Sequence, residues 1–327
     1  MTVDQKPLIK IVATGGTIAN TRAGRIPVQQ VIEEIRERYP ETAEVLDRAC
    51  LEVIDLIRVG SEVFTSKEFL DIARTVHEAA QDPKVTGIIV TQGTFTTEET
   101  AYILHLVVKT QKPIVITNSQ RRHGTVSNDG DKNLVDSISV ALAPEAAGKG
   151  ALVVSNQTIN CGREVLKTSS RPDAFVCGEH GILGVVENDG VNFYRAPTRR
   201  HTFNSEFDIK TIASFPKVEV VNAYYDADPG MIKAAAELGV RGIVLNGLTN
   251  RGTPHEIQKP VLEELTAKGI PVVRTARGGV NNRVTVEAKD KLIGGDNLPA
   301  HKARILLQLA LTKTDDFKEI QRIFKEY

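Results

Sequence analysis

The chain has 327 residues, a length that favours two α/β lobes over a single domain. Lys plus Arg and Asp plus Glu balance at 41 each, so the chain lacks the overall charge that would attract nucleic acid or an anionic membrane surface. We therefore expect a small-molecule partner, with no nucleic acid and no membrane.

The cysteines and histidines give no sign of a disulfide framework or a metal site. Cys50, Cys161 and Cys177 are an odd number without CxxC spacing, and the seven histidines are scattered. We expect no metal and no cofactor. The first ten residues lead into a strand rather than a signal segment, and no run approaches the length of a membrane span. The expected compartment is the cytoplasm, or the periplasm if a signal peptide was trimmed.

In the first half, short apolar runs ending in Gly, Thr or Asn alternate with amphipathic stretches, which predicts strand–helix units and a mostly parallel sheet. Four predicted strands lead into polar loops: 8–13 into Thr14-Gly15-Gly16-Thr17, 51–57 into Gly60-Ser61-Glu62, 87–90 into Thr91-Gln92-Gly93-Thr94, and 113–117 into Asn118-Ser119-Gln120. In open α/β sheets, ligands bind beyond the carboxyl ends of the strands. We therefore expect these four loops to lie together at one site.

The pattern lapses into a polar, turn-rich stretch from about residue 195 to residue 216. The alternation of strands and helices then resumes, with predicted strands at 218–221, 242–245 and 271–274 and predicted helices at 229–238 and 255–267. Residues 315–327 have apolar side chains at helical spacing, which predicts a last helix. We predict an α/β protein with a larger, mostly parallel N-terminal domain (1–195), a linker (196–216) and a smaller C-terminal α/β domain (217–327).

The Gly pair at positions 15 and 16 lets backbone amides approach a ligand, and the flanking hydroxyls suit either a phosphate cradle or a placed nucleophile. A phosphate loop would read GxGxxG with a following acid, or end in Gly-Lys-Ser/Thr, and this loop does neither. A purely structural turn would need no second hydroxyl loop, yet Gly93-Thr94 repeats the arrangement. We expect two hydroxyls, those of Thr17 and Thr94, to converge.

Residues 11–19, Ile-Val-Ala-Thr-Gly-Gly-Thr-Ile-Ala, resemble the N-terminal signature of the bacterial asparaginase/glutaminase family. Further similarities follow in the family's order: Gly60-Ser61-Glu62, Gly93-Thr94 with residues 98–102, residues 162–168 and residues 302–312. The resemblance covers essentially the whole chain. Its motifs are specific for the family and much less so for one substrate.

The resemblance implies that Thr17 is the nucleophile, that Thr94 and Lys167 handle its proton, and that a small amide is hydrolysed through an acyl-enzyme. A lysine can act as a base only when it is neutral, and the alternative for Lys167 is a solvated surface lysine. Backbone amides of the glycine loops would hold the oxyanion. Substrate contacts are expected from Gly16, Ser61, Glu62, Gly93, Phe95 and Ser119. The family forms tetramers from intimate dimers, so a homo-oligomer is expected.

The chain departs from the family at its second signature, where His-Gly-Thr-Asp-Thr is replaced by Gln92-Gly93-Thr94-Phe95-Thr96. The resemblance implies that the missing aspartate holds the substrate's α-ammonium group and neighbours the lysine. Burying an ammonium group without a carboxylate costs on the order of several kcal/mol. We therefore predict a carboxamide or cyclic amide substrate without the free α-amino acid head, and a lowered pKa for Lys167.

Other family positions are also changed. The segment 20–27, where the family has a lid tyrosine, has none. Thr21 could replace that hydroxyl, as could a tyrosine of a neighbouring chain, and Arg25 could close over a carboxylate or simply be solvated. A family glutamate supplied by a neighbouring subunit aligns near Val284, and a family asparagine near Asp226.

Two rival functions stay open. One is a true L-asparaginase/glutaminase in which Glu62, Asp226 or Asp228 replaces the missing carboxylates. The other is a non-catalytic amide-binding protein that has kept the fold. Comparable turnover of asparagine and non-amino amides would favour the first, and tight binding without product release would favour the second.

Overall fold

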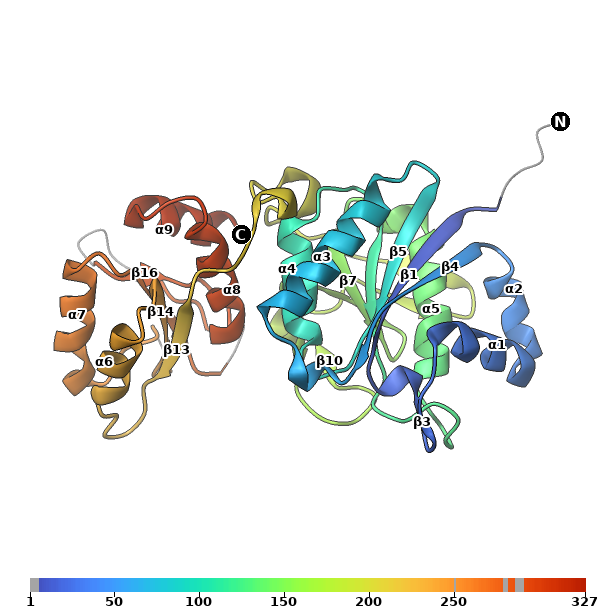
Figure 1. The fold of residues 1–327 in the computed structure, drawn as a ribbon, viewed down its shortest axis with the longest axis horizontal. Helices are drawn as coiled ribbons and strands as arrows, with labels where there is room; N and C mark the ends of the chain where they lie inside the picture. Colours follow the sequence, from blue (N-terminus) through green and yellow to red (C-terminus); the bar gives the residue numbers. More distant parts are fainter. Residues whose placement is uncertain (1–5, 250, 279–281, 286–290) are drawn as a thin grey trace. The chain divides into compact units, whose positions relative to one another are not determined.

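The computed structural model describes residues 6–249, 251–278, 282–285 and 291–327. The chain forms two compact units, Met1–Thr211 and Ile212–Tyr327, and each has helices packed on a sheet (Figure 1). The predicted fold class is therefore confirmed. The boundary between the units falls inside residues 196–216, the predicted linker. Phe207 and Ile209 are buried, and most of that segment belongs to the first unit.

Within the described residues, the first unit is built on an eight-stranded sheet with the order β12-β11-β8-β7-β6-β5-β1-β4. Its strands are β1 (Leu8–Gly15), β4 (Cys50–Val59), β5 (Val85–Thr91), β6 (Ile114–Thr117), β7 (Ala151–Ser155), β8 (Thr158–Cys161), β11 (Gly184–Glu187) and β12 (Gly190–Phe193). The strands from β4 to β7 run parallel, whereas β8, β11 and β12 are antiparallel additions at one side. The four strands predicted before polar loops correspond to β4, β1, β5 and β6.

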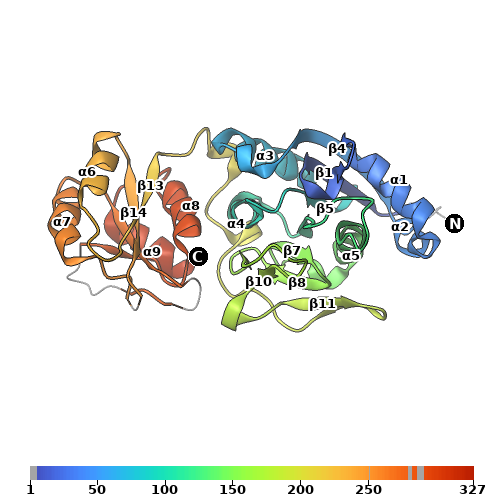
Figure 2. The same cartoon turned by 90° about the horizontal axis from the view of Figure 1, so that it is seen from below.

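Helices cover both faces of this sheet (Figures 1 and 2). They are α1 (Val28–Arg38), α2 (Ala43–Leu46), α3 (Ser66–Gln81), α4 (Thr97–Val107) and α5 (Gly130–Leu142). On one face, α1, α2 and α5 share an apolar cluster with strand residues such as Ile9 and Ile11. On the other, α3 and α4 pack against each other and the sheet. Since both faces are covered, the central strands are continuous apolar runs.

In the part of the chain that the structure describes, two short antiparallel sheets accompany the large sheet. The hairpin of β2 (Asn20–Thr21) and β3 (Gly24–Arg25) follows β1, separated from it by the 3-10 turn η1 (Thr17–Ala19). The pair of β9 (Leu166–Lys167) and β10 (Phe175–Val176) carries the predicted lysine base. Figure 1 shows β3 and β10 toward the end of the unit where β1 finishes.

The second unit has the parallel sheet order β13-β14-β15-β16. Its elements are β13 (Val218–Asn222), α6 (Gly230–Glu237), β14 (Gly242–Gly247), α7 (Lys259–Ala267), β15 (Val272–Ala276), β16 (Ile293–Gly294), α8 (Ala300–Ala310) and α9 (Phe317–Glu326). The helix predicted over 255–267 begins only at Lys259, after a 3-10 turn at Glu256–Gln258. The predicted tail helix is confirmed as α9, whose Ile320 and Phe324 are buried.

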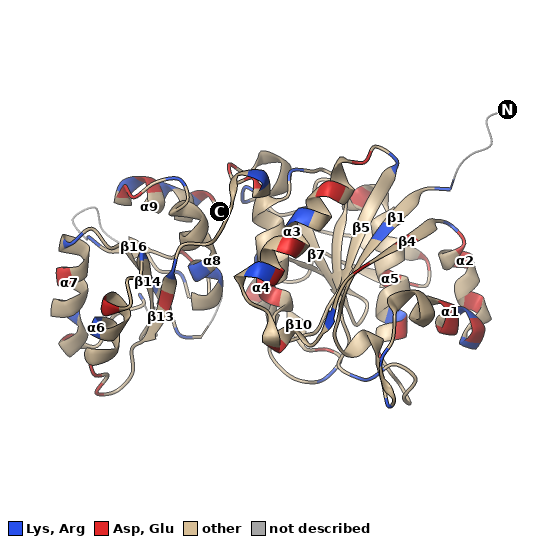
Figure 3. Cartoon of the chain, in the orientation of Figure 1, with Lys and Arg blue, Asp and Glu red and all other residues tan. Residues whose placement is uncertain are grey.

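Charge is mixed over both units, and α1 and α3 each carry acidic and basic side chains (Figure 3). Among the described residues, no helix combines the length and the apolar character needed to cross a membrane.

Candidate active site

The loops that follow β1, β4 and β5 touch one another at the carboxyl edge of the sheet. A Cβ atom on Gly16 would lie 2.3 Å from the backbone nitrogen of Gly93, and one on Gly93 would lie 2.8 Å from the Ser61 Oγ atom. Gly16 also has a φ of +82°, which favours glycine. The glycines thus allow three chain segments to approach more closely than side chains would permit.

Hydrogen bonds hold these loops in place. The Thr14 hydroxyl donates to the carbonyl of Thr91 at 2.8 Å, which ties the first loop to the third. The Gly16 N–H donates to the carbonyl of Val59 at 2.9 Å. The expected oxyanion role of the glycine amides therefore does not extend to Gly16, whose N–H is already used by the fold.

Thr17 follows immediately and begins the 3-10 turn η1. Ile18 and Ala19 are buried and anchor the turn in the core, whereas Thr17 is only half-buried. Over the ranges that the structure describes, the Thr17 hydroxyl and N–H have no hydrogen-bond partner, and the N–H groups of Gly93 and Thr94 also have none. A hydroxyl and several amide donors are therefore left available in this region.

Thr94 and Lys167 meet directly. The Lys167 Nζ atom lies 2.7 Å from the Thr94 Oγ1 atom, and Thr94 is buried. Burial lowers the pKa of Lys167 below its ordinary value, and the nearby Glu98 carboxylate partly opposes that shift. This is the direction expected from the sequence, and it favours the neutral lysine that a base requires.

Phe95 lies beside this pair. Its ring centroid is 5.0 Å from the Lys167 Nζ atom, and 68% of the side chain's reference surface is exposed. A large apolar side chain at this exposure is open to contact with a ligand. The Lys167 amine thus lies beside an aromatic ring, whereas the family resemblance implies an aspartate carboxylate at position 95.

The other side chains predicted to contact the substrate differ in whether their polar atoms are free of hydrogen bonds within the protein. Glu62 is exposed, and its carboxylate folds over Gly60, where a Cβ atom would lie 2.3 Å from both oxygens. The Ser61 hydroxyl is buried without a hydrogen-bond partner in the described part of the chain. The Ser119 hydroxyl donates to the carbonyl of Arg121 at 2.7 Å, so its proton serves its own loop.

The predicted lid is a tight hairpin. The Thr21 hydroxyl donates to the carbonyl of Gly24 at 2.9 Å and accepts the N–H of Ala23 at 3.1 Å. Both bonds close the hairpin turn itself, so the idea that Thr21 replaces the missing tyrosine hydroxyl gains no support. Arg25 is exposed, and no ion-pair partner for it is found among the residues described.

The second unit contains the positions aligned with the family's other ammonium contacts. Asp226 and Asp228 are exposed, and Asp228 Oδ1 accepts the N–H of Gly230 at 2.7 Å. Val284 is buried, and its N–H donates to the carbonyl of Asp296 at 2.7 Å. The Val284 side chain is thus part of its own unit's core, while the two aspartates remain open to solvent.

Glu98 is a residue of the site that the sequence prediction did not assign. Its Oε1 atom accepts the backbone N–H of Lys167 at 2.6 Å. The available signal was its place in the first turn of α4, four residues after Thr94.

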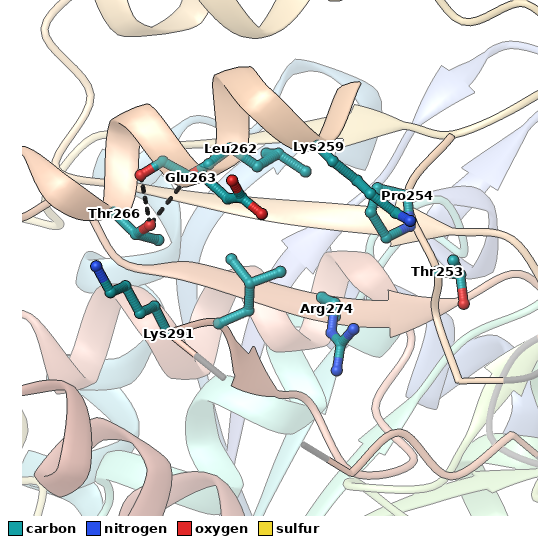
Figure 4. A pocket seen from close by; sticks show the side chains of 9 residues that line it. Thr253, Pro254, Lys259, Leu262, Glu263, Thr266, Arg274 and Lys291 are labelled. Carbon is teal, nitrogen blue, oxygen red and sulfur yellow. Dashed lines mark hydrogen bonds between the residues drawn. The ribbon is translucent and has the colours of Figure 1, made fainter. Parts of the chain in front are cut away.

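A separate hollow of about 570 Å³ lies in the second unit, under α7. Figure 4 shows the Glu263 carboxylate between Lys259 and Lys291, with Arg274 on the strand below. Its lining includes none of the residues predicted to carry chemistry. We therefore place the candidate active site in the loop cluster of the first unit.

The comparisons with protein families agree with these motifs. The family description "Asparaginase, N-terminal" matches residues 8–199, and "Glutaminase/Asparaginase C-terminal domain" matches residues 217–324. Together they span both units.

Several known proteins are similar over nearly the whole chain. The "Glutaminase-asparaginase" of Pseudomonas fluorescens biotype A is 36% identical over 98% of this chain and 90% of its own length. "L-asparaginase 2" of Bacillus subtilis (strain 168) is 37% identical over 98% of this chain and 87% of its own length. The crystal structure titled "Probable Cytoplasmic L-asparaginase from Campylobacter jejuni" is 35% identical, with a TM-score of 0.91 over 98% of this chain and 100% of that one.

Proposed function

The chain belongs to the asparaginase/glutaminase family of amidohydrolases, and we propose that it hydrolyses a small carboxamide or cyclic amide, rather than free L-asparagine, with Thr17 as the nucleophile. The observation that carries this proposal is the Lys167–Thr94 hydrogen bond of 2.7 Å beside the ring of Phe95. The two residues that would accept the proton thus lie beside an apolar ring, at the position where the family resemblance implies a carboxylate that binds the substrate's ammonium group.

The proposed reaction has two steps. The Thr17 Oγ atom attacks the amide carbonyl, its proton passes by way of the base to the departing nitrogen, and the C–N bond breaks to leave an ester to Thr17. A linear carboxamide releases ammonia in this step, whereas a cyclic amide opens and keeps its amine on the acyl group. Water then attacks this ester, releases the carboxylic acid and restores the Thr17 hydroxyl. The available N–H groups of Thr17 and Thr94 are candidates to stabilise the negative oxygen in each step.

Lys167 and Thr94 would move the proton in this scheme. An alcohol attacks well only when a base takes its proton, and neutral Lys167 is such a base. The buried Thr94 hydroxyl already lies within hydrogen-bond distance of the Lys167 amine. Burial lowers the pKa of Lys167, which raises its neutral fraction near neutral pH and supports this role.

The exposed ring of Phe95 supports the choice of substrate. A free α-ammonium group placed beside this ring and the Lys167 amine would lose water without gaining the carboxylate expected at position 95, which is costly. A substrate that is unsubstituted, acylated or ring-closed at its α-position avoids this cost and can pack on the ring.

A panel of amides tests the proposal. Product release would be measured from asparagine, glutamine, succinamate, N-acylated asparagines and small lactams or imides, with Thr17→Ala as the blank. We expect turnover of at least one amide without a free amino acid head to exceed that of asparagine. Fast hydrolysis of asparagine beside negligible activity on the others would overturn it.

A second candidate function is a true L-asparaginase/glutaminase. Relatives that match nearly the whole chain carry the names glutaminase-asparaginase and L-asparaginase 2, and the exposed Glu62 carboxylate is available as a substitute anion. Comparable rates on asparagine and on succinamate, with the asparagine rate lost in Glu62→Gln, would favour this function. The expected tetramer of intimate dimers stays a prediction in either case.

A further inference from the structure

The strand that carries Lys167 is weakly held by its own secondary structure. β9 has two residues, and within the described part of the chain it pairs with the two residues of β10, so that Lys167 lies opposite Phe175. These two strands form a separate small sheet rather than an edge of the large one. A base on such a short element needs other contacts to fix its position.

Glu98 supplies one of these contacts. It lies in the first turn of α4, and its Oε1 atom accepts the backbone N–H of Lys167 at 2.6 Å. The Lys167 Nζ atom also lies 2.7 Å from the Oγ1 atom of Thr94, and Thr94 is four residues before Glu98 in the chain. The short segment 94–98 therefore holds Lys167 at both its main chain and its amine. A hydrogen bond to a carboxylate is stronger than one between neutral groups, which suits a fixed position.

Glu98 also supplies charge. The groups that face Lys167 from the segment 94–98 are the Thr94 hydroxyl, the Phe95 ring and the Glu98 carboxylate, and β10 contributes the apolar Phe175. Among the described residues, Glu98 is the charged group that acts on the pKa of Lys167, and it raises that pKa against the effect of burial. The aspartate expected at position 95 would have had a similar electrostatic effect.

We propose that Glu98 is a positioning residue that aligns Lys167 with Thr94 and serves as the counter-ion of the Lys167 ammonium in a site where Phe95 replaces the expected carboxylate. This role rests on the proposed function in one respect, which is that Lys167 acts as the base. The position and the electrostatic influence of Glu98 can be measured without any substrate.

Nuclear magnetic resonance of protein with ¹³C-labelled lysine measures this directly. The Lys167 signal is identified by its absence in Lys167→Met and is then titrated in the wild type, in Glu98→Gln, in Glu98→Ala and in Glu99→Gln. Removing the charge in Glu98→Gln should lower the pKa of Lys167, because an anion that stabilises the ammonium form is lost. Glu99→Gln, one residue along the same helix, should leave it unchanged.

Kinetics with succinamate, or with asparagine if that is hydrolysed faster, provides the second readout. In Glu98→Gln, the ratio of kcat at pH 6 to kcat at pH 9 should rise about threefold, since more lysine is neutral at low pH. Glu98→Ala also loses the tether and should lower kcat about tenfold or more, with little change in KM. If Glu98→Ala does not fold, the Gln variant alone carries the test.

The outcomes separate this inference from the proposed function. An unchanged Lys167 titration in Glu98→Gln overturns the inference, even if both Glu98 variants lose stability, because a purely structural residue would not move that pKa. Full activity in Lys167→Met overturns the proposed base. The titration shift in Glu98→Gln would still be visible in that case, so the two failures differ.

Discussion

The Lys167 amine lies over the ring of Phe95, with 5.0 Å between the Nζ atom and the ring centroid. A cation–π contact of this kind stabilises an ammonium group by roughly 0.5–1 kcal/mol at an exposed site, less than the roughly 1.5–3 kcal/mol of a hydrogen bond to a charged group. The ring therefore contacts the lysine but stabilises its ammonium form less than a carboxylate at position 95 would. It also offers an apolar surface to a substrate.

An aspartate at position 95 should stabilise the ammonium form of Lys167 and should favour substrates that carry an α-ammonium group. In Phe95→Asp, an anion beside Lys167 stabilises its ammonium form, so the acidic limb of the rate profile should move to higher pH. The same anion can pair with an α-ammonium group, so we expect kcat/KM for L-asparagine relative to succinamate to rise at least about tenfold, equal to roughly 1.4 kcal/mol. Steady-state kinetics on both amides measures the ratio.

Phe95→Leu is the matched control, since it removes the ring without adding charge. It should leave the ratio of asparagine to succinamate activity within about threefold of the wild type, a difference of less than roughly 1 kcal/mol. If Leu and Asp at position 95 shift the preference equally, the missing charge does not determine it.

Removing the amine should abolish most of the activity. Lys167→Met keeps the apolar length of the side chain but cannot accept a proton, so kcat should fall about 10²- to 10⁴-fold. The melting temperature should change little, because Lys167 is only half-buried and lies outside the large sheet. Activity and melting temperature would be compared with those of Lys313→Met, an exposed lysine of the second unit. Equal activity in both variants would exclude Lys167 as the base.

The fold could be predicted from the sequence because its signals are local. The apolar run 8–13 and the following Gly pair indicate a strand and a loop without reference to any other segment, and the structure has β1 there. The convergence of the glycine loops also follows from a general rule for parallel sheets. These inferences need only periodicity and turn chemistry.

The contacts of the site depend on tertiary structure and could not be predicted in the same way. Glu98 and Lys167 are 69 residues apart, and nothing local to either indicates the bond between them. Ser119 and Thr21 stay predictions, and the sequence did not indicate that each hydroxyl bonds to a carbonyl two or three residues away. A family resemblance assigns such residues by position and does not reveal whether their protons are already used.

The closeness of the loops predicts a strong effect of a small substitution. In Gly16→Ala, the added Cβ atom would lie 2.3 Å from the Gly93 backbone nitrogen, and neither segment has a flexible side chain to move aside. We expect a destabilisation of more than about 2 kcal/mol and a loss of activity of at least about 100-fold, since Thr17 would be displaced. Urea denaturation and kcat measure the two effects.

Gly239→Ala is the control for a positive φ without a backbone contact. Gly239 has a φ of +73°, close to that of Gly16, but a Cβ atom there would meet nothing within 4 Å. It should cost only about 1 kcal/mol and leave kcat unchanged. Similar losses in the two variants would mean that the contact between Gly16 and Gly93 is unimportant.

The buried His123 predicts a dependence of stability on pH. Its Nδ1 atom lies 2.8 Å from an oxygen of Asp131 on α5, and its Nε2 atom lies 2.8 Å from an oxygen of Glu34 on α1. The hydrogen bond to Asp131, aided by the one to Glu34, raises the pKa of His123 above its ordinary value despite burial. The protonated imidazole therefore connects two helices of one face of the sheet.

The sign follows from the raised pKa. The contribution of His123 to stability is fully present below its unfolded pKa of about 6.5, and it is lost as the pH rises through the higher folded value. His123→Gln should therefore destabilise the protein by about 2 kcal/mol at pH 6 and by distinctly less at pH 9. The free energies of unfolding of both proteins would be measured across this range, with the exposed His180→Gln as control. A difference that stays constant from pH 6 to pH 9 would show that the charge of His123 does not stabilise the fold.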